Sequence, residues 1–187
     1  MVTMVATLVV SACSYATDDA NDATLPATDA DIGFLQDMAD HHAQAVLMAS
    51  FIARHGENEQ VQGLAFDILA SQSEERGRIA ALLQDRGTGA GDPDRDAMAW
   101  MDMPVPVDAM PGMIPGDDLA AFQNLDGAAL DRRFLELMQS HHEGGVEMAE
   151  HGRAEAEDPR VADLAAQMLV SQQKELTDIA LLLGPAD

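Results

Sequence analysis

Apolar side chains recur at steps of three and four residues along two long stretches of the chain. The first stretch runs from Asp31 to Leu83 and the second from Asp131 to Leu183, and a short polar interval divides each of them near its middle. Such a period places the apolar positions on one face of an α-helix. The pattern therefore predicts four amphipathic helices, two in each stretch.

The two stretches are copies of each other. FLQDMADHHAQAVLMA at positions 34–49 returns as FLELMQSHHEGGVEMA at positions 134–149, and a gap-free alignment of residues 31–83 with 131–183 has 21 identities in 53 positions. Shared apolar positions continue through the second half of each copy, so the repeat covers two helices each time. Each copy is predicted to be a helical hairpin.

Helix-end signals support this division. Gly56 follows the first predicted helix, Asn58 and Asp158 occupy equivalent N-cap positions, and Pro159 stands at the first helical position, where proline is tolerated. Two such hairpins bury their apolar stripes by packing together. We therefore predict one all-α domain over residues 28–187, a ferritin-like antiparallel four-helix bundle with pseudo-twofold symmetry. Its hairpins cover about 29–86 and 127–184.

A segment of about 40 residues, 87–126, joins the hairpins and is far longer than an ordinary connection between antiparallel helices. It is interrupted by five prolines, which prevent a continuous helix: Pro93, Pro104, Pro106, Pro111 and Pro115. One short helix is expected over 117–124, and no strand pattern stands out. The length fits the long crossover of ferritin-like bundles.

The first thirteen residues resemble the end of a bacterial export signal. Residues 1–12 are apolar and end in small residues before Cys13, the only cysteine, in a lipobox-like Val-Ser-Ala-Cys. The basic segment that opens a secretion signal is missing, and the apolar run is too short to span a bilayer. We predict an extracytoplasmic protein that is anchored in the cell membrane by lipid on Cys13, with residues 14–27 as a flexible tether.

The charge balance narrows the choice of partners. Thirty-three acidic residues against ten basic ones give a formal net charge of -23, which disfavours nucleic acid and anionic lipid surfaces. Cations or a cationic partner surface are favoured, although such a surface also serves solubility alone. No phosphate loop or nucleophile motif is present, and we expect no enzymatic activity.

Paired histidines mark equivalent points of the two copies. At least one member of each pair must point inward, and the partner helices interrupt their apolar stripes with Gln72, Glu75, Gln172 and Glu175. The pattern predicts a polar layer at mid-height that contains His41, His42, His141, His142 and these four side chains. Buried polar groups must satisfy one another or bind a ligand, so the layer is either a hydrogen-bonded lock or a metal site. A di-iron site is disfavoured because the Glu-x-x-His motifs are absent.

Methionines form a second candidate metal-binding set. Met38, Met138, Met48 and Met148 lie in register with the apolar stripes, where they fill the core or, for Met38, Met138 and Met148, add ligands to the histidines. Five more methionines gather in the crossover around Trp100, where no core stripe is expected: Met98, Met101, Met103, Met110 and Met113. Thioethers with imidazoles suit Cu(I), but these side chains also suit packing of the crossover over the bundle. His55 and His151, near helix ends, are interpreted as structural, with an outer metal ligand as the alternative for His151 because it lies one turn past Met148.

The repeated motifs of this sequence resemble those of a known family. The sequence is similar to the secreted bacterial family called domain of unknown function 305. Three motifs carry the resemblance: Phe-Leu-x-x-Met-x-x-His-His-x-x-x-Val-x-Met-Ala, which occurs twice, Met-Pro-Gly-Met at 110–113, and Ser-Gln-x-x-Glu in each partner helix. The resemblance covers about residues 29–183. It implies an exported ferritin-like bundle, with copper binding or tolerance in some members. A metal role for the four paired histidines, Met110 and Met113 follows from that resemblance.

Three departures from the family pattern matter. Ala43-Gln44-Ala45 becomes Glu143-Gly144-Gly145 in the second copy, which predicts that the two sites are not equivalent. Leucine pairs at 82–83 and 182–183 stand where such proteins often have Trp-Leu. Histidine is sparse in the crossover, which argues against a high-capacity copper store.

Two functions remain open from the sequence. The first is a copper-binding protein that sequesters or delivers Cu(I) through methionine and histidine. The second is a non-catalytic accessory lipoprotein of a cell-envelope membrane complex, in which the histidine and glutamate layer only holds the bundle together.

Overall fold

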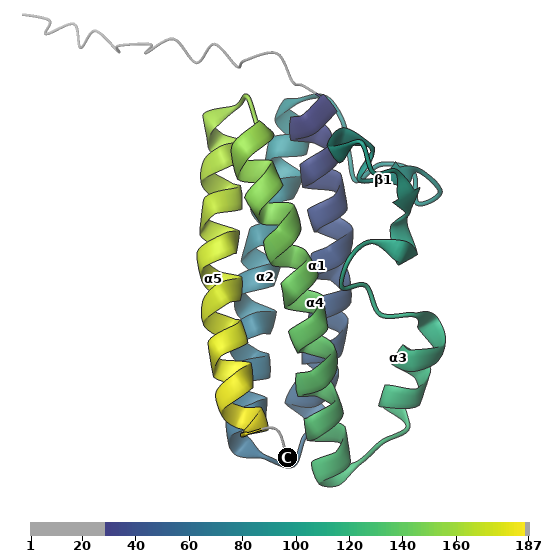
Figure 1. Cartoon of the computed structure of the whole chain (residues 1–187), viewed down its shortest axis with the longest axis vertical. Coiled ribbons are helices and arrows are strands. Elements are labelled where there is room, and N and C mark those ends of the chain that lie inside the picture. Colours follow the sequence, from purple (N-terminus) through teal and green to yellow (C-terminus); the bar gives the residue numbers. More distant parts are fainter. Residues whose placement is uncertain (1–28, 186–187) are drawn as a thin grey trace, which may run out of the picture.

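Four long helices make up most of the molecule. The computed structural model describes residues 29–185, in which α1 spans Asp29–His55, α2 Glu59–Asp85, α4 Gly127–Glu155 and α5 Pro159–Leu183 (Figure 1). The fold is all-α, as predicted. Within each repeat, a turn of only three residues joins the two long helices, α1 to α2 and α4 to α5, so each repeat is a tight hairpin.

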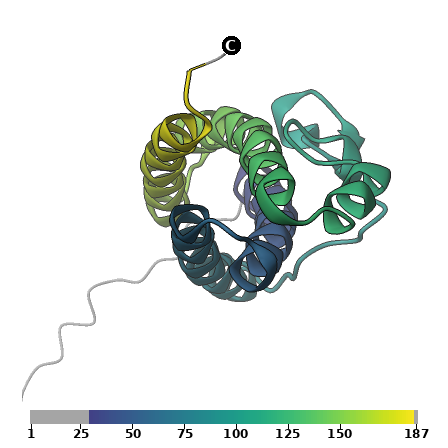
Figure 2. The same cartoon turned by 90° about the horizontal axis from the view of Figure 1, so that it is seen from below.

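Seen along their length, the long helices surround a common centre, and the crossover lies outside them beside α1 and α4 (Figure 2). α1 packs against α2 and α4, and α4 packs against α5. The two histidine-bearing helices are therefore neighbours across the junction between the hairpins.

The predicted helix starts are confirmed. The Asn58 side chain accepts a hydrogen bond from the Gln60 amide at 2.8 Å, and Asp158 accepts one from the Arg160 amide at 2.8 Å. These caps satisfy amides that the first helical turn leaves without partners.

Each hairpin turn is also held by an aspartate of the other hairpin. Asp131 accepts backbone amides of Glu57 and Asn58, and Asp31 accepts those of Glu157 and Asp158. Asp31 and Asp131 occupy equivalent positions of the repeat. The reciprocal contacts tie the hairpins together at both ends of the molecule.

The hydrophobic core forms two clusters, one toward each end. Phe134, Met138 and Ile52 belong to one, while Phe34, Met38 and Met148 belong to the other. All six side chains are almost fully buried. The polar layer described below involves helix positions between these groups.

The crossover contains more structure than the sequence predicts. The expected short helix is α3, Gly116–Gln123, and two 3-10 turns also form, η1 at Ala99–Met101 and η2 at Val107–Ala109. A two-residue antiparallel ladder pairs β1, Asp96–Ala97, with β2, Val105–Pro106. No strand pattern was expected here, because two residues are too few to show a period of two.

Asp37 of α1 anchors the first half of the crossover. Its carboxylate pairs with Arg95 at 2.6 Å and accepts the Met98 amide at 2.7 Å and the Trp100 indole N–H at 2.8 Å. Gly33 makes room for the Trp100 ring, because a Cβ at that position would lie 2.4 Å from the ring. One buried carboxylate thus organises three residues of a segment without helical period.

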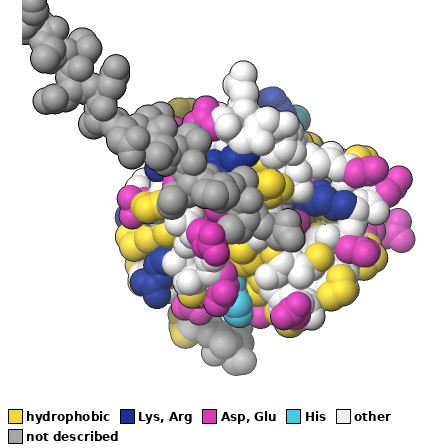
Figure 3. Space-filling view, turned by 90° about the horizontal axis from the view of Figure 1, so that it is seen from above, with side chains coloured by type: hydrophobic (Ala, Val, Ile, Leu, Met, Phe, Trp, Pro, Cys, Tyr) yellow, Lys and Arg dark blue, Asp and Glu magenta, His cyan; other side chains and the backbone are white. Residues whose placement is uncertain are grey.

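The predicted signal remnant, the lipid site at Cys13 and the tether lie outside the described residues. Among residues 29–185, no helix has the length and apolar character needed to cross a membrane. Acidic side chains are spread over the end of the bundle shown in Figure 3.

Candidate metal site at the centre of the bundle

Four imidazoles line up across the junction of α1 and α4. His41, His42, His141 and His142 are each 0% exposed, so both members of each pair point inward. His41 and His141 meet at the centre with ring centroids 3.7 Å apart, and each lies about 6 Å from the other histidine of its own pair.

The outer histidines bind the predicted glutamates. His42 Nε2 lies 2.7 Å from Glu75 Oε2, and His142 Nε2 lies 2.6 Å from Glu175 Oε2. An Nε2–H that donates to a carboxylate leaves the Nδ1 lone pair without a proton. Metal-binding histidines are commonly oriented by such a carboxylate contact.

Serine hydroxyls extend this network across the hairpins. Ser71 donates to Glu175 at 3.2 Å, and Ser171 donates to Glu75 at 3.3 Å. Each glutamate therefore contacts a histidine of its own hairpin and a serine of the other. The glutamates that orient the imidazoles therefore also link the two hairpins.

The central imidazoles are held neutral. Burial lowers the pKa of His41 well below its usual value, and the positive potentials of His42 and His142 lower it further. Carbonyls of Pro111 and His141 oppose this shift without reaching hydrogen-bond geometry. Burial likewise lowers the pKa of His141. Neutral imidazole is the form that binds metals.

Many polar atoms in this layer lack a hydrogen-bond partner within the described residues. They include both ring nitrogens of His41 and His141, Nδ1 of His42 and His142, and the side-chain amides of Gln72 and Gln172. Leaving such a group unpaired in the interior costs about 1–3 kcal/mol. A ligand that used these lone pairs would recover part of this cost.

A short piece of the crossover, residues 110–114, covers the central histidines. We call it the strap. Gly144 permits its approach, because a Cβ there would lie 2.1 Å from the Pro111 carbonyl oxygen. Gly112, with φ near 79°, also lies close to α4, because a Cβ there would be 2.6 Å from the His141 carbonyl oxygen.

Gln44 of α1 clamps the end of the strap. Its side chain donates to the Ile114 carbonyl at 3.0 Å and accepts the Ile114 amide at 2.7 Å. The counterpart of Gln44 is Gly144, which serves the strap from the opposite side. The predicted inequivalence of the two copies therefore has a visible structural basis.

The structure disperses the crossover methionines. Met98 and Met110 are buried in the core cluster that contains Met38 and Met148. Met101 and Met113 are half-buried against the same cluster, whereas Met103 is 43% exposed. Met138 is buried in the other cluster. The five crossover thioethers thus do not form one buried group, but Met110 and Met113 both belong to the strap.

Harder metals have no preformed site here. Among residues 29–185, no three side chains of the His, Cys, Asp or Glu types lie close enough together to hold a metal ion. His55 and His151 are exposed, the first against Phe51 and the second against the Glu147 carbonyl.

Two site residues were missed by sequence reasoning. Gln44 was noted only as a difference between the copies, and Asp37 was not singled out. Their partners belong to the crossover, where no period predicts which residues approach the bundle. The contrast of Gln44 with Gly144 was the one signal available.

Comparison with known proteins now places the chain in a family. The model of "Domain of unknown function (DUF305)" matches residues 31–183. This chain belongs to the DUF305 family. No curated protein sequence matches it.

Solved structures of similar proteins agree with this assignment. A DUF305 protein from Streptomyces coelicolor, provisionally described as secreted, is 34% identical with a TM-score of 0.76, covering 82% of this chain and 91% of that one. A DUF305 fragment from Deinococcus radiodurans is 31% identical with a TM-score of 0.74, covering 86% and 99%. CopM in its Cu(I)-bound form is 26% identical with a TM-score of 0.59, covering 80% and 91%. CopM in a Cu(II)-bound form, at 23% identity, shows the shared fold alone.

Proposed function

We propose that this DUF305 protein binds Cu(I) as cargo in the cell envelope, between the central imidazoles and the thioethers of the strap. One observation carries the proposal. His41 and His141 are fully buried with ring centroids 3.7 Å apart, and within residues 29–185 none of their four ring nitrogens has a hydrogen-bond partner; the segment above them bears Met110 and Met113.

The lone pairs are available without deprotonation. The lowered pKa values of His41 and His141 leave both rings neutral at ordinary pH. Cu(I) therefore competes with few protons for these nitrogens, which favours binding at neutral pH. The glutamate contacts of His42 and His142 hold the neighbouring rings in fixed orientations.

The type of ligand favours a soft ion. Thioether and imidazole suit Cu(I), whereas Zn and di-iron sites need several nitrogen, thiolate or carboxylate ligands around one point, and no three such side chains of residues 29–185 are arranged in that way. Cu(I) is satisfied by two or three ligands, so a histidine pair and one or two thioethers suffice. Met110 and Met113 flank Pro111 closely in the sequence, and the carbonyl of Pro111 faces His41.

Exchange of the ion requires movement of the strap. The four histidines are completely buried, and residues 110–114 are held by Gln44 and by the close approach at Gly144. Copper enters or leaves when these contacts open. Such gated access suits sequestration or delivery of the ion.

Further observations support the location and the metal. A similar protein is described as secreted, and the apolar segment before Cys13 suits export with a lipid anchor. CopM, which shares this fold, has been solved with Cu(I). A net charge of -23 also raises the local concentration of cations.

Cu(I) titration against a competing chelator under reducing conditions tests the proposal. We expect one ion per chain, with Met110→Leu/Met113→Leu weakening binding by roughly ten-fold or more, because leucine keeps the volume but removes sulfur. Met48→Leu is the matched control, since Met48 is buried but lies outside the strap. Equal loss in the control, or no copper retained by the wild type, would reject the proposal.

One alternative rests on its own observation. The reciprocal Ser71–Glu175 and Ser171–Glu75 contacts hold the hairpins together without any metal. In this case the chain is a non-catalytic accessory lipoprotein of a membrane complex. An unchanged melting temperature on Cu(I) addition, together with a stable partner co-purified from native membranes, would favour it.

A further inference from the structure

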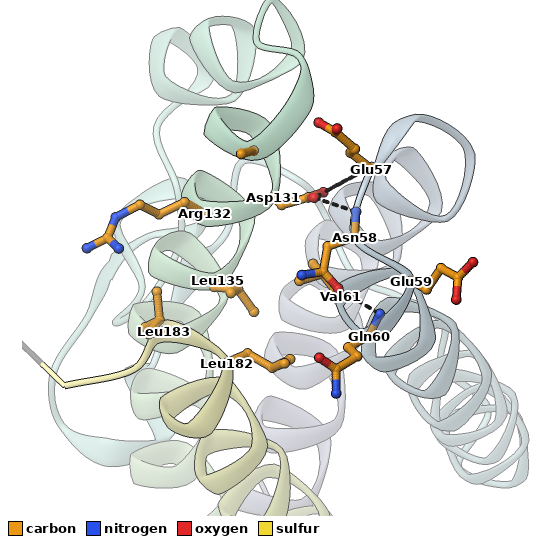
Figure 4. Close-up of a pocket in the computed structure, with 11 residues that line it drawn as sticks. Glu57, Asn58, Glu59, Gln60, Val61, Asp131, Arg132, Leu135, Leu182 and Leu183 are labelled. Carbon is orange, nitrogen blue, oxygen red and sulfur yellow. Dashed lines mark hydrogen bonds between the residues drawn. The ribbon is translucent and has the colours of Figure 1, made fainter.

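An open pocket lies at the end of the bundle where α1 turns into α2. It has a volume of about 630 Å³ and is lined by residues of the α1–α2 turn, the start of α4 and the end of α5 (Figure 4). Val61, Leu135, Leu182 and Leu183 provide its apolar wall. Asp131 faces the turn residues Glu57 and Asn58, while Arg132 extends away from them.

The pseudo-twofold symmetry shows what fills the equivalent place at the opposite end. There Arg86, which follows α2, is buried with only 4% of its side chain exposed. Its guanidinium donates to the Leu82 carbonyl at 2.8 Å and forms a short ion pair with Asp158. An arginine side chain therefore occupies the junction between the end of one long helix and the N-cap of the next hairpin's second helix.

The open pocket is built from the counterparts of these residues. One hundred positions along the repeat, Leu82 corresponds to Leu182 and Asp158 to Asn58, and both line the pocket. Arg86 corresponds to Ala186, which carries no guanidinium. The pocket thus keeps the counterpart of Leu82, has the neutral Asn58 in place of the carboxylate of Asp158, and receives no arginine at the position equivalent to Arg86.

Charge in the pocket also favours a cation. Asp131 is only 4% exposed, it accepts two backbone amides, and no ion pair within residues 29–185 involves it. Glu57 and Glu59 add acidic groups at the rim. The amides at the start of α2 are already taken by Asp131 and Asn58, whereas the end of α5 presents the negative pole of its helix dipole.

We infer that this pocket binds an arginine side chain of a partner polypeptide. The guanidinium lies against Asp131 and the end of α5, and its aliphatic stem packs on Leu135 and Leu182. This site is separate from the central histidines, so it gives the protein a docking point that does not depend on copper. A chain with so many acidic residues is expected to favour a cationic partner.

Titration of the isotope-labelled full chain with the blocked peptide Ac-Gly-Arg-Gly-NH2, followed by NMR, tests the inference. We expect saturable shifts of the amides at positions 57–61 and 128. The citrulline peptide, which has the same shape without charge, should bind at least ten-fold more weakly.

A gain-of-function variant gives the sharper test. Asn58→Asp gives the pocket the counterpart of Asp158, the carboxylate that pairs with Arg86 at the other end of the bundle. Aspartate caps a helix as well as asparagine does, so the start of α2 should be preserved. We expect binding of the arginine peptide to tighten about ten-fold. Asp131→Asn should weaken it by a similar factor, and circular dichroism will show that each variant is folded.

Arg86→Ala is the matched control at the opposite end. Removing this side chain should open a second pocket beside Asp158 and lower the melting temperature. The arginine peptide should then shift amides near residue 158 and raise the melting temperature of the variant again. Equal binding of arginine and citrulline peptides, no saturable shift, or no gain in Asn58→Asp would overturn the inference. A dimer of the purified chain that already shifts residues 57–61 would also overturn it, because the chain would then fill its own pocket.

Discussion

The contact between His41 and His141 places two neutral rings where neither has a hydrogen-bond partner in the described chain. Stacking and exclusion of water stabilise the pair, but the unpaired nitrogens oppose this by about 1–3 kcal/mol for each group. A protein that only needed a packed core would do better with leucine at these positions. The unpaired nitrogens thus support the proposal that these imidazoles bind a ligand.

The central histidines should make the protein acid-sensitive. Their folded-state pKa values are lowered, so the unfolded chain binds protons more readily and stability falls as the pH drops below the unfolded value of about 6.5. The slope approaches about 2.7 kcal/mol per pH unit for the two residues together, until the folded-state pKa values are reached. Urea unfolding at pH 7.5, 6.5 and 5.5 measures it.

His55→Ala provides the control for this slope, because His55 is exposed at the end of α1. The variant should keep the same pH dependence as the wild type. His41→Leu/His141→Leu should flatten it. A slope that is unchanged in the double variant would show that other groups cause the acid sensitivity.

The sequence predicted which helix side chains point into the bundle, but it did not predict which of them contact the crossover. The periods of α1 and α2 put Glu75 and at least one of His41 and His42 on inward faces, and their spacing in the duplicate repeats this, whereas the structure buries both histidines of each pair. The stacking of His41 on His141 depends on the crossing of α1 and α4, which no period in the sequence encodes. For the same reason the roles of Gln44 and Asp37 were visible only in three dimensions.

At the scale of elements, packing of the crossover on the bundle requires the backbone of the strap to approach α4 closely at Gly144. Gly144→Ala would place a methyl group 2.1 Å from the Pro111 carbonyl oxygen, so the strap must move away from α4. We expect the free energy of unfolding to fall by about 1–3 kcal/mol. Urea unfolding checks this.

Gly77→Ala is the matched control, because Gly77 lies within α2 and faces open space. Alanine there should stabilise the helix by about 0.5–1 kcal/mol. If both variants shifted stability in the same direction, the close approach at Gly144 would not be the cause.

The clamp on the strap should also be separable from global stability. Gln44→Ala removes both hydrogen bonds to Ile114, so amides in residues 110–114 should exchange with deuterium at least ten-fold faster. Amides in the middle of α5 should be unaffected. Ser50→Ala, another polar change on α1 away from the strap, is the control, and equal exchange at 110–114 in Gln44→Ala and wild type would refute the clamp.

The long helices and the short α3 were predictable because their signals are local. Caps at Asn58 and Asp158 and a sustained apolar period mark them directly. The β1–β2 ladder and the 3-10 turns were not, since they are held by contacts such as Asp37 with Arg95 and Met98 across about 60 positions. Prolines in the crossover indicated only where a helix could not form.

At the scale of the whole molecule, acidic side chains dominate. The net charge of -23 produces self-repulsion in the compact state that salt screens. We expect the melting temperature to rise by roughly 2–6 °C between 20 and 300 mM NaCl. KCl at the same ionic strength should give the same rise, and a constant or falling melting temperature would show that repulsion is not limiting.

The two hairpins of this bundle belong to one chain, so equivalent positions of the repeat can carry different residues. In a symmetric dimer of identical hairpins, every substitution would occur in both copies. A glycine that makes room for the strap in one copy would then also replace the glutamine that clamps the strap in the other. Joining the copies in one chain removes that constraint. Gln44 and Gly144 can then hold opposite sides of a single segment, and Arg86 can close one end while the other stays open. Covalent duplication allowed one architecture to carry two different surfaces.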